Sequence, residues 1–201
     1  MSGVRCDRIL APTTWVALLL LLGGATLGLK AAVIPAKAML AQRLLSSAWR
    51  RAQAGELAPR PWSWADAWPV ARLQLPDAAH VVLAGTEGSA LAFAPAWVPA
   101  SAAPGSVGTT VIAAHRDTHF RGLERLAVGD SVHVQTAEGT TVTYRVSATE
   151  VHNLRRAPLL TLREDGQQHL ALITCYPFDT LRADPTQRYV VWARAQPDPP
   201  G

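Results

Sequence analysis

The sequence contains little cysteine and almost no lysine, and both shortages exclude classes of protein. Cys6 and Cys175 are its two cysteines, and no Cys-x-x-Cys occurs. This excludes a cysteine-based zinc site of the common spacing and a thioredoxin-like redox motif. Lysine occurs only as Lys30 and Lys37, so arginine supplies almost all of the positive charge, and the net charge is +4. The arginines are scattered and form no basic block interleaved with aromatic residues, so we do not expect nucleic-acid binding.

Charged residues are also missing from one long stretch near the N-terminus, Ile9 to Leu29. At about 1.5 Å per residue, this run is long enough for a hydrocarbon core of roughly 30 Å. Arg5 and Arg8 precede it, which favours a short N-terminal tail that stays in the cytoplasm. We therefore expect residues 1–35 to form a cytoplasmic tail and a single-pass anchor in the cytoplasmic membrane. The rest of the chain would lie outside the cytoplasm, in the periplasm if the cell is Gram-negative.

The apolar run has two other interpretations. A cleaved signal peptide is the first, but the small-x-small sequence Ala36-Lys37-Ala38 lies well past the apolar run. A buried helix of a soluble domain is the second, and the leucines of Leu18–Leu22 leave it no polar face. With an anchor in place, Cys6 and Cys175 lie on opposite sides of the membrane and cannot form a disulfide.

The segment after the anchor has helical periodicity. Apolar residues recur at helical spacing from Ala36 to Ala54, and Pro59-Arg60-Pro61 then punctuates the chain. We assign residues 36–60 to an amphipathic helix and linker, either a stalk on the outer leaflet or a helix packed on the globular domain. Trp62, Trp64 and Trp68 follow and could line a ligand groove, sit at the membrane interface or pack in the core.

Strand signals dominate from residue 61 onward. Short apolar runs, several with period-two alternation, predict about eight strands and a mainly β domain over 61–196, closed or nearly closed into a barrel. Short helices are expected around Phe120–Leu126 and Pro158–Arg163, and the tail 197–201 is expected to be disordered. The predicted strands are Val70–Leu75, His80–Ala84, Leu91–Phe93, Thr109–Ala114, Ser131–Thr136, Thr141–Val151, Leu170–Thr174 and Tyr189–Ala195.

Cys175 ends an apolar strand, and Pro177 prevents that strand from continuing. His115 ends a second apolar strand in the same way. If these strands are parallel neighbours, the thiol and the imidazole open onto the same end of the barrel, as a cysteine nucleophile and its acid/base partner require. Each residue also has a plainer interpretation: Cys175 as a small buried apolar residue, and His115 as a surface histidine, with His119 as a competitor for its role.

Two further sets of residues near these strand ends could have a chemical role. Arg188 begins the last apolar strand, where a permanently charged guanidinium could stabilise an oxyanion; Arg182 could do the same from the loop, and either could be a solvated cation. His115, Asp117 and His119 could form part of a metal site. No third histidine or nearby acidic residue completes such a site, so we predict none.

Together these residues resemble the sortase family. The segment Ala171-Leu172-Ile173-Thr174-Cys175 resembles the sortase signature Thr-Leu-x-Thr-Cys, with Ala171 in place of the first threonine. It stands between a strand-end histidine and an arginine that opens the next strand. The likeness runs from about Trp62 to Ala195 and is strongest to class D and related Gram-negative sortases. The segments that carry this class likeness are Trp62–Leu73, His115-Arg116-Asp117-Thr118 and Ile173-Thr174-Cys175-Tyr176-Pro177.

The resemblance implies an eight-stranded barrel with an extracytoplasmic active site and no organic cofactor. It implies that Cys175 attacks a C-terminal sorting motif of a partner protein, and that an amine at the cell surface resolves the thioacyl enzyme. His115 and Arg188 would be the other catalytic residues. Thr174 would support the site beside Arg188, and Asp117 would orient the loop around His115. Some sortases use calcium through an acidic cluster, which this sequence lacks.

Three alternatives remain open at the level of sequence. A papain-like peptidase has its cysteine before its histidine, whereas here His115 comes first. A peptidoglycan L,D-transpeptidase places its nucleophile in a Ser/His-Gly-x-x-Gly/Cys setting, which is absent around Cys175. A non-enzymatic adhesion or assembly barrel would not need the thiol at all.

Overall fold

The computed structural model describes residues 12–85, 91–156, 165–180, 182 and 184–197. The chain forms two compact units, Met1–Leu40 and Ala41–Gly201. The arginines before the apolar run, the helix expected at 158–163 and the tail from residue 198 lie outside the described residues.

One helix, α1 (Pro12–Gln53), contains both the apolar run and the amphipathic segment. Pro35 lies inside it; the missing N–H removes one helical hydrogen bond without ending the helix. Within the described part of the chain, this is the one helix that is long and apolar enough to cross a membrane by length and composition.

The last part of α1, from Ala41 to Gln53, belongs to the Ala41–Gly201 unit and packs on its barrel. Leu45 and Ala48 are fully buried and Trp49 is 3% exposed; this spacing places them on one helix face. Leu45 packs in a cluster with Leu83 and Ala94. Of the two roles considered for this segment, the structure therefore supports packing on the globular domain.

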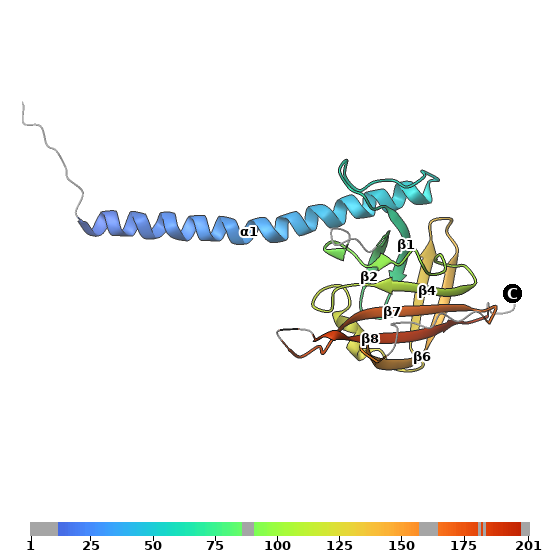
Figure 1. Ribbon diagram of the computed structural model, residues 1–201. Coiled ribbons are helices and arrows are strands. Elements are labelled where there is room, and N and C mark those ends of the chain that lie inside the picture. The colour runs from blue at the N-terminus through green and yellow to red at the C-terminus, as the bar shows by residue number, and fades with distance from the viewer. Residues whose placement is uncertain (1–11, 86–90, 157–164, 181, 183, 198–201) are drawn as a thin grey trace, which may run out of the picture. The chain divides into compact units, whose positions relative to one another are not determined.

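Eight strands form a closed barrel in the order β1-β2-β3-β4-β7-β8-β6-β5 (Figure 1). Pairing of β1 with β5 closes it. Two neighbouring pairs are parallel, β2 with β3 and β4 with β7. The prediction of an eight-stranded barrel is confirmed. The strands are β1 (Pro69–Gln74), β2 (Ala79–Ala84), β3 (Ala96–Trp97), β4 (Gly108–Ala113), β5 (Ser131–Thr136), β6 (Thr141–Asn153), β7 (Gln168–Tyr176) and β8 (Asp184–Ala195).

Alternating residues of the strands fill the barrel. Leu73, Val132 and Val134 are fully buried in one core cluster, as period-two patterning requires. Phe120 and Leu123 come from the segment around the short 3-10 helix η1 (Arg121–Arg125) and extend the same core, so the expected short helix is present. The core also holds Tyr144.

One strand prediction is wrong. The structure has no strand at Leu91–Phe93, and β3 lies a few residues later, where Ala96 pairs with Leu83 of β2 and Ala113 of β4. Phe93 instead packs edge-on against Trp62, with 5.0 Å between ring centroids. The apolar character of this segment therefore reflects a tertiary contact outside the sheet.

The three tryptophans after the linker have different environments. Trp62 is partly buried against the Leu45 cluster, Trp68 is 38% exposed and Trp64 is 81% exposed. Core packing thus accounts for Trp62 and does not account for Trp64.

Candidate active site

Parallel pairing of β4 and β7 brings the ends of these two strands together. Ala113 pairs with Ile173, and the N–H of Ala114 donates to the carbonyl of Ile173 at 3.1 Å. His115 and Cys175 each lie two residues beyond the Ala113–Ile173 pair. They therefore leave the sheet at the same end of the barrel.

Thr174 joins the two strand ends from its side chain. Its Oγ1 donates to the carbonyl of Ala114 at 2.8 Å, and the residue is 2% exposed. This buried hydrogen bond fixes the backbone directly before Cys175 against the backbone directly before His115.

Arg188 reaches the same place from β8. This strand is antiparallel to β7, and Arg188 is the direct partner of Cys175 in the register. Directly opposed residues of neighbouring strands have Cβ atoms about 5 Å apart, so the arginine begins beside the thiol. The chain after β7 therefore returns to the same end of the barrel, as the sequence interpretation of Arg188 requires.

His115, Cys175 and Arg188 line a single cavity of about 290 Å³. His115 is exposed at its mouth and Cys175, a free thiol, is partly buried. The remaining lining is almost wholly apolar, which weakens solvent screening of charges inside the cavity. These other lining residues are Leu91, Val98, Val111, Ala113, Ala114, Ile173 and Thr174.

The guanidinium of Arg188 is held by its own strand. Its Nη1 donates to the carbonyls of Gln187 at 2.8 Å and Pro185 at 3.2 Å. The carboxylate of Asp184 caps the same segment by accepting from Thr186 Oγ1 at 2.6 Å and from the Thr186 N–H at 2.7 Å. These bonds, with smaller contributions from nearby arginine charges, lower the pKa of Asp184.

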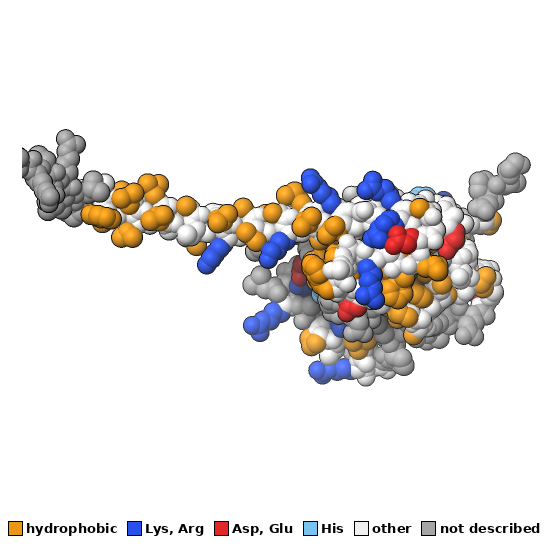
Figure 2. Space-filling view, turned by 90° about the horizontal axis from the view of Figure 1, so that it is seen from above, with side chains coloured by type: hydrophobic (Ala, Val, Ile, Leu, Met, Phe, Trp, Pro, Cys, Tyr) orange, Lys and Arg blue, Asp and Glu red, His pale blue; other side chains and the backbone are white. Residues whose placement is uncertain are grey.

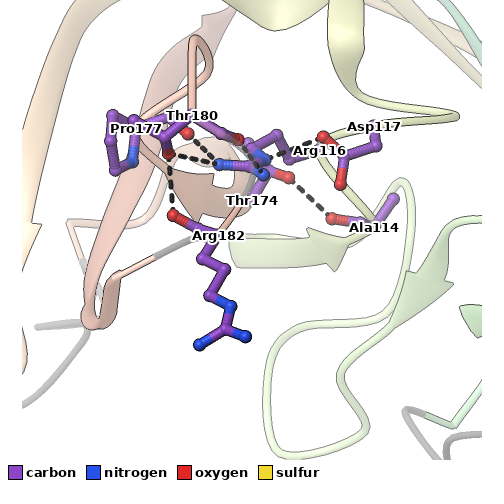
Figure 3. A network of polar contacts seen from close by, with 7 residues as sticks. All are labelled: Ala114, Arg116, Asp117, Thr174, Pro177, Thr180 and Arg182. Carbon is purple, nitrogen blue, oxygen red and sulfur yellow. Dashed lines mark hydrogen bonds and ion pairs between the residues drawn. The ribbon is translucent and has the colours of Figure 1, made fainter.

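Arg116 is the residue that sequence reasoning missed. It is 5% exposed and lies between the loop after β4 and the loop after β7 (Figure 3). Nη2 donates to the carbonyl of Thr180 at 2.8 Å, and Nη1 donates to the carbonyl of Pro177. In the sequence, Arg116 stands out only within His115-Arg116-Asp117-Thr118, one of the segments that carry the class likeness, and it has no assigned role there. No local sequence signal marks Arg116 as buried, because its partners Pro177 and Thr180 lie 61 and 64 residues further along the chain.

Asp117 and Arg182 contribute less directly than expected. Asp117 Oδ1 accepts from Arg116 Nε at 2.9 Å, and its side chain is 73% exposed. It therefore acts on the loop after His115 through Arg116. Arg182 accepts from Thr180 Oγ1 through its backbone carbonyl at 2.7 Å, and its side chain extends away from this network (Figure 3).

His119, the competitor for the role of His115, does not line the cavity. Its ring packs edge-on against His80 with 5.4 Å between centroids. Burial lowers the pKa of both rings, and the neighbouring His80 lowers the pKa of His119 further. No group of three His, Cys, Asp or Glu side chains suited to a metal occurs within the described ranges.

Comparisons with known proteins agree on one family. The model of the sortase domain matches residues 73–196, more than half of the chain. Sortase D of Bacillus subtilis (strain 168) is 31% identical over 91 residues, which are 45% of this chain and 44% of that protein. The chain thus spans less than half the length of this relative.

Solved structures share the fold. Sortase A from Corynebacterium diphtheriae has a TM-score of 0.58 and 25% identity, covering 68% of this chain and 65% of the other. A Sortase D5 transpeptidase from Clostridium perfringens has a TM-score of 0.63 and 18% identity, covering 79% and 99%. Sortase C-1 from Actinomyces oris has a TM-score of 0.55 and 24% identity, covering 64% and 73%.

Proposed function

Because the chain belongs to the sortase family, we propose that it is a membrane-anchored cysteine transpeptidase. It cuts a C-terminal sorting motif of a partner protein and joins the new carboxyl end to an amine at the cell surface. One observation carries this proposal: His115 after β4, Cys175 near the end of β7 and Arg188 near the start of β8 line one cavity.

In the first step, the thiolate of Cys175 attacks the carbonyl carbon of the scissile peptide, and the carbonyl electrons move onto oxygen. The guanidinium of Arg188 stabilises that oxyanion, and the apolar lining strengthens the attraction. Collapse of the adduct breaks the C–N bond. Protonated His115 donates a proton to the leaving amine, and a thioester on Cys175 remains.

In the second step, an acceptor amine attacks the thioester carbonyl. Neutral His115 takes a proton from the attacking nitrogen, and the second adduct expels the Cys175 thiolate. An amide bond has then replaced the thioester, and the enzyme returns with a protonated imidazole and a thiolate.

Thr174 and Asp117 have supporting roles in this proposal. The Thr174–Ala114 hydrogen bond keeps the strands that carry the thiol and the imidazole in register. Asp117 pairs with Arg116, which braces the loop that begins at His115. Neither residue acts on the reacting atoms.

The first half of α1 is the proposed anchor. Its apolar composition supports a single pass through the cytoplasmic membrane, and the two arginines before it favour a cytoplasmic N-terminus. The barrel would then meet its protein substrate and its amine acceptor on the extracytoplasmic side. The sequence divides on this scheme into tail and anchor (1–35), amphipathic helix and linker (36–60) and catalytic barrel (61–196).

Transfer can be tested with the full chain in detergent and a pool of fluorescent peptides randomised at five positions. Triglycine serves as the amine, and products are read by mass spectrometry. We expect triglycine-coupled products that disappear with Cys175→Ala and fall by on the order of 100-fold with Arg188→Ala. Release of cleaved peptide that does not depend on triglycine would show a peptidase instead. Activity on muropeptides alone would show an L,D-transpeptidase, and no activity with either would favour a non-enzymatic module.

A further inference from the structure

A second and larger hollow lies away from the candidate active site. It has a volume of about 640 Å³ and runs between the second half of α1 and the β1–β2 hairpin. We call it the arginine groove after Arg43, Arg50 and Arg72, which line it together with polar side chains. Figure 2 looks onto the face of the barrel unit that carries the end of α1, where Arg side chains lie with Asp and Glu side chains among them. The other lining residues are Gln42, Ser46, Trp49, Gln53, Ala79 and Val81.

The side chains that line the groove include three positive charges and no negative charge. None of its lining residues is acidic, and within the described ranges its three arginines take part in no ion pair. Other arginines of the same unit do find partners: Arg51 pairs with Glu56 at 2.8 Å, and Arg125 pairs with Asp77. Like charges that converge without counter-charges repel one another, so an anion bound in the groove would relieve this repulsion.

The donors present suit a phosphate group. A guanidinium offers a planar pair of N–H donors that matches phosphate oxygens. Arg43 and Arg50 are two helical turns apart on α1, and Arg72 faces them from β1. The hydroxyl of Ser46 supplies a neutral donor between Arg43 and Arg50. The amide of Gln42, beside Arg43, donates one N–H to the carbonyl of Phe93 at 2.9 Å and keeps its second N–H as a donor.

We propose that the arginine groove binds the phosphate headgroups of anionic membrane lipids and so docks the barrel on the bilayer surface. This inference rests on the membrane anchor of the proposed function. Arg43 lies 14 residues beyond Leu29, the end of the uncharged run. Even a fully extended chain of that length reaches only about 50 Å. The groove is therefore tethered close to a high local concentration of headgroups, which favours lipid over a free phosphate compound.

The test uses the full chain in nanodiscs, either of neutral phosphatidylcholine or with about 30 mol% phosphatidylglycerol. Phenylglyoxal modification of individual arginines is followed by peptide mass mapping. We expect Arg43, Arg50 and Arg72 to react about 5-fold more slowly in the anionic discs, the factor for one arginine near an anionic surface. The exposed Arg156 and Arg194 serve as internal controls and should change less than about 2-fold. About 0.5 M NaCl should restore the faster rates.

Paired variants test whether the groove acts as a unit. Arg43→Gln with Arg50→Gln should abolish the slowing at Arg72, whereas Arg156→Gln with Arg194→Gln removes the same charge and should leave it intact. Equal rates in the two kinds of disc, or equal slowing at every arginine, would overturn the proposal. Slowing in neutral discs with added pyrophosphate, and none in anionic discs, would overturn lipid as the source.

Co-elution of the chain with neutral discs tests the anchor separately. A chain that leaves neutral discs but is retained by anionic discs through the three arginines would contradict the anchor and support the groove. A chain retained by both, with no arginine protected, would support the anchor and contradict the groove.

Discussion

Replacing Arg116 by alanine should loosen the loop that carries His115 and destabilise the barrel. The side chain is buried and donates to the carbonyls of Pro177 and Thr180. Removing it leaves both carbonyls without this charged donor, and hydrogen bonds to charged groups contribute about 1.5–3 kcal/mol each. The ion pair with Asp117 adds little because that carboxylate is largely exposed.

Part of that loss is offset, because the alanine variant no longer buries a charge. We therefore expect the free energy of unfolding of the barrel to fall by about 2–4 kcal/mol. Urea unfolding of the full chain in detergent, followed by near-UV circular dichroism, measures this change. Hydrogen exchange should also speed up in the loops after β4 and β7.

Two variants serve as controls for this prediction. Arg116→Lys keeps the charge but replaces the planar fork with one ammonium group, so it should lose about half as much stability. Arg121→Ala removes an exposed arginine five residues on and should change stability by less than about 0.5 kcal/mol. If Arg116→Ala matches Arg121→Ala in stability and in loop exchange, the bracing role assigned to Arg116 is wrong.

Three further predictions concern single residues of the barrel. The Tyr144 hydroxyl is buried with no hydrogen-bond partner among the described residues, and burial raises its pKa to about 12. Tyr144→Phe should therefore leave the free energy of unfolding in urea unchanged or raise it by about 1 kcal/mol. A loss of stability above that size would contradict this reasoning. Thr174→Val deletes the bond to the Ala114 carbonyl and should cost about 1–2 kcal/mol, most of which Thr174→Ser should restore. Because the pKa of Asp184 is lowered in the folded state, its stabilising contribution is present above about pH 4 and is lost as the pH falls through the folded pKa. Asp184→Asn should therefore be less stable than the wild type at neutral pH and equal to it in strong acid. A difference in the free energy of unfolding that does not depend on pH would refute this.

His115 and Cys175 could be predicted as site residues from the sequence because each lies where an apolar strand ends. Apolar runs that stop at His115 and Cys175, with Pro177 just beyond, mark the end of a sheet without knowledge of its neighbours. The register that places Arg188 beside Cys175 follows from the return of the chain after β7. The parallel pairing of β4 with β7, which brings His115 and Cys175 to the same end of the barrel, is a contact between distant segments that the structure supplies.

Other features depend on contacts between distant segments, and local patterns did not give them. Arg116 is buried where it donates to the loop after β7, a segment far along the chain. In the apolar Leu91–Phe93 run, Phe93 contacts Trp62 and Leu91 lines the candidate active-site cavity, and the run does not form a strand. The shortness of β3, which has only Ala96 and Trp97, leaves too few residues for any alternation to appear.

The claim that the thiol, the imidazole and the guanidinium act on one adduct is tested most directly by the covalent intermediate. Intact-protein mass spectrometry of the full chain, after brief incubation with the randomised peptides and no amine, should show a hydroxylamine-sensitive acyl group on Cys175. Its rate of formation should fall by on the order of 100-fold in Arg188→Ala, and its discharge by triglycine should slow by a similar factor in His115→Ala. Acylation and discharge at wild-type rates in either variant would contradict the account.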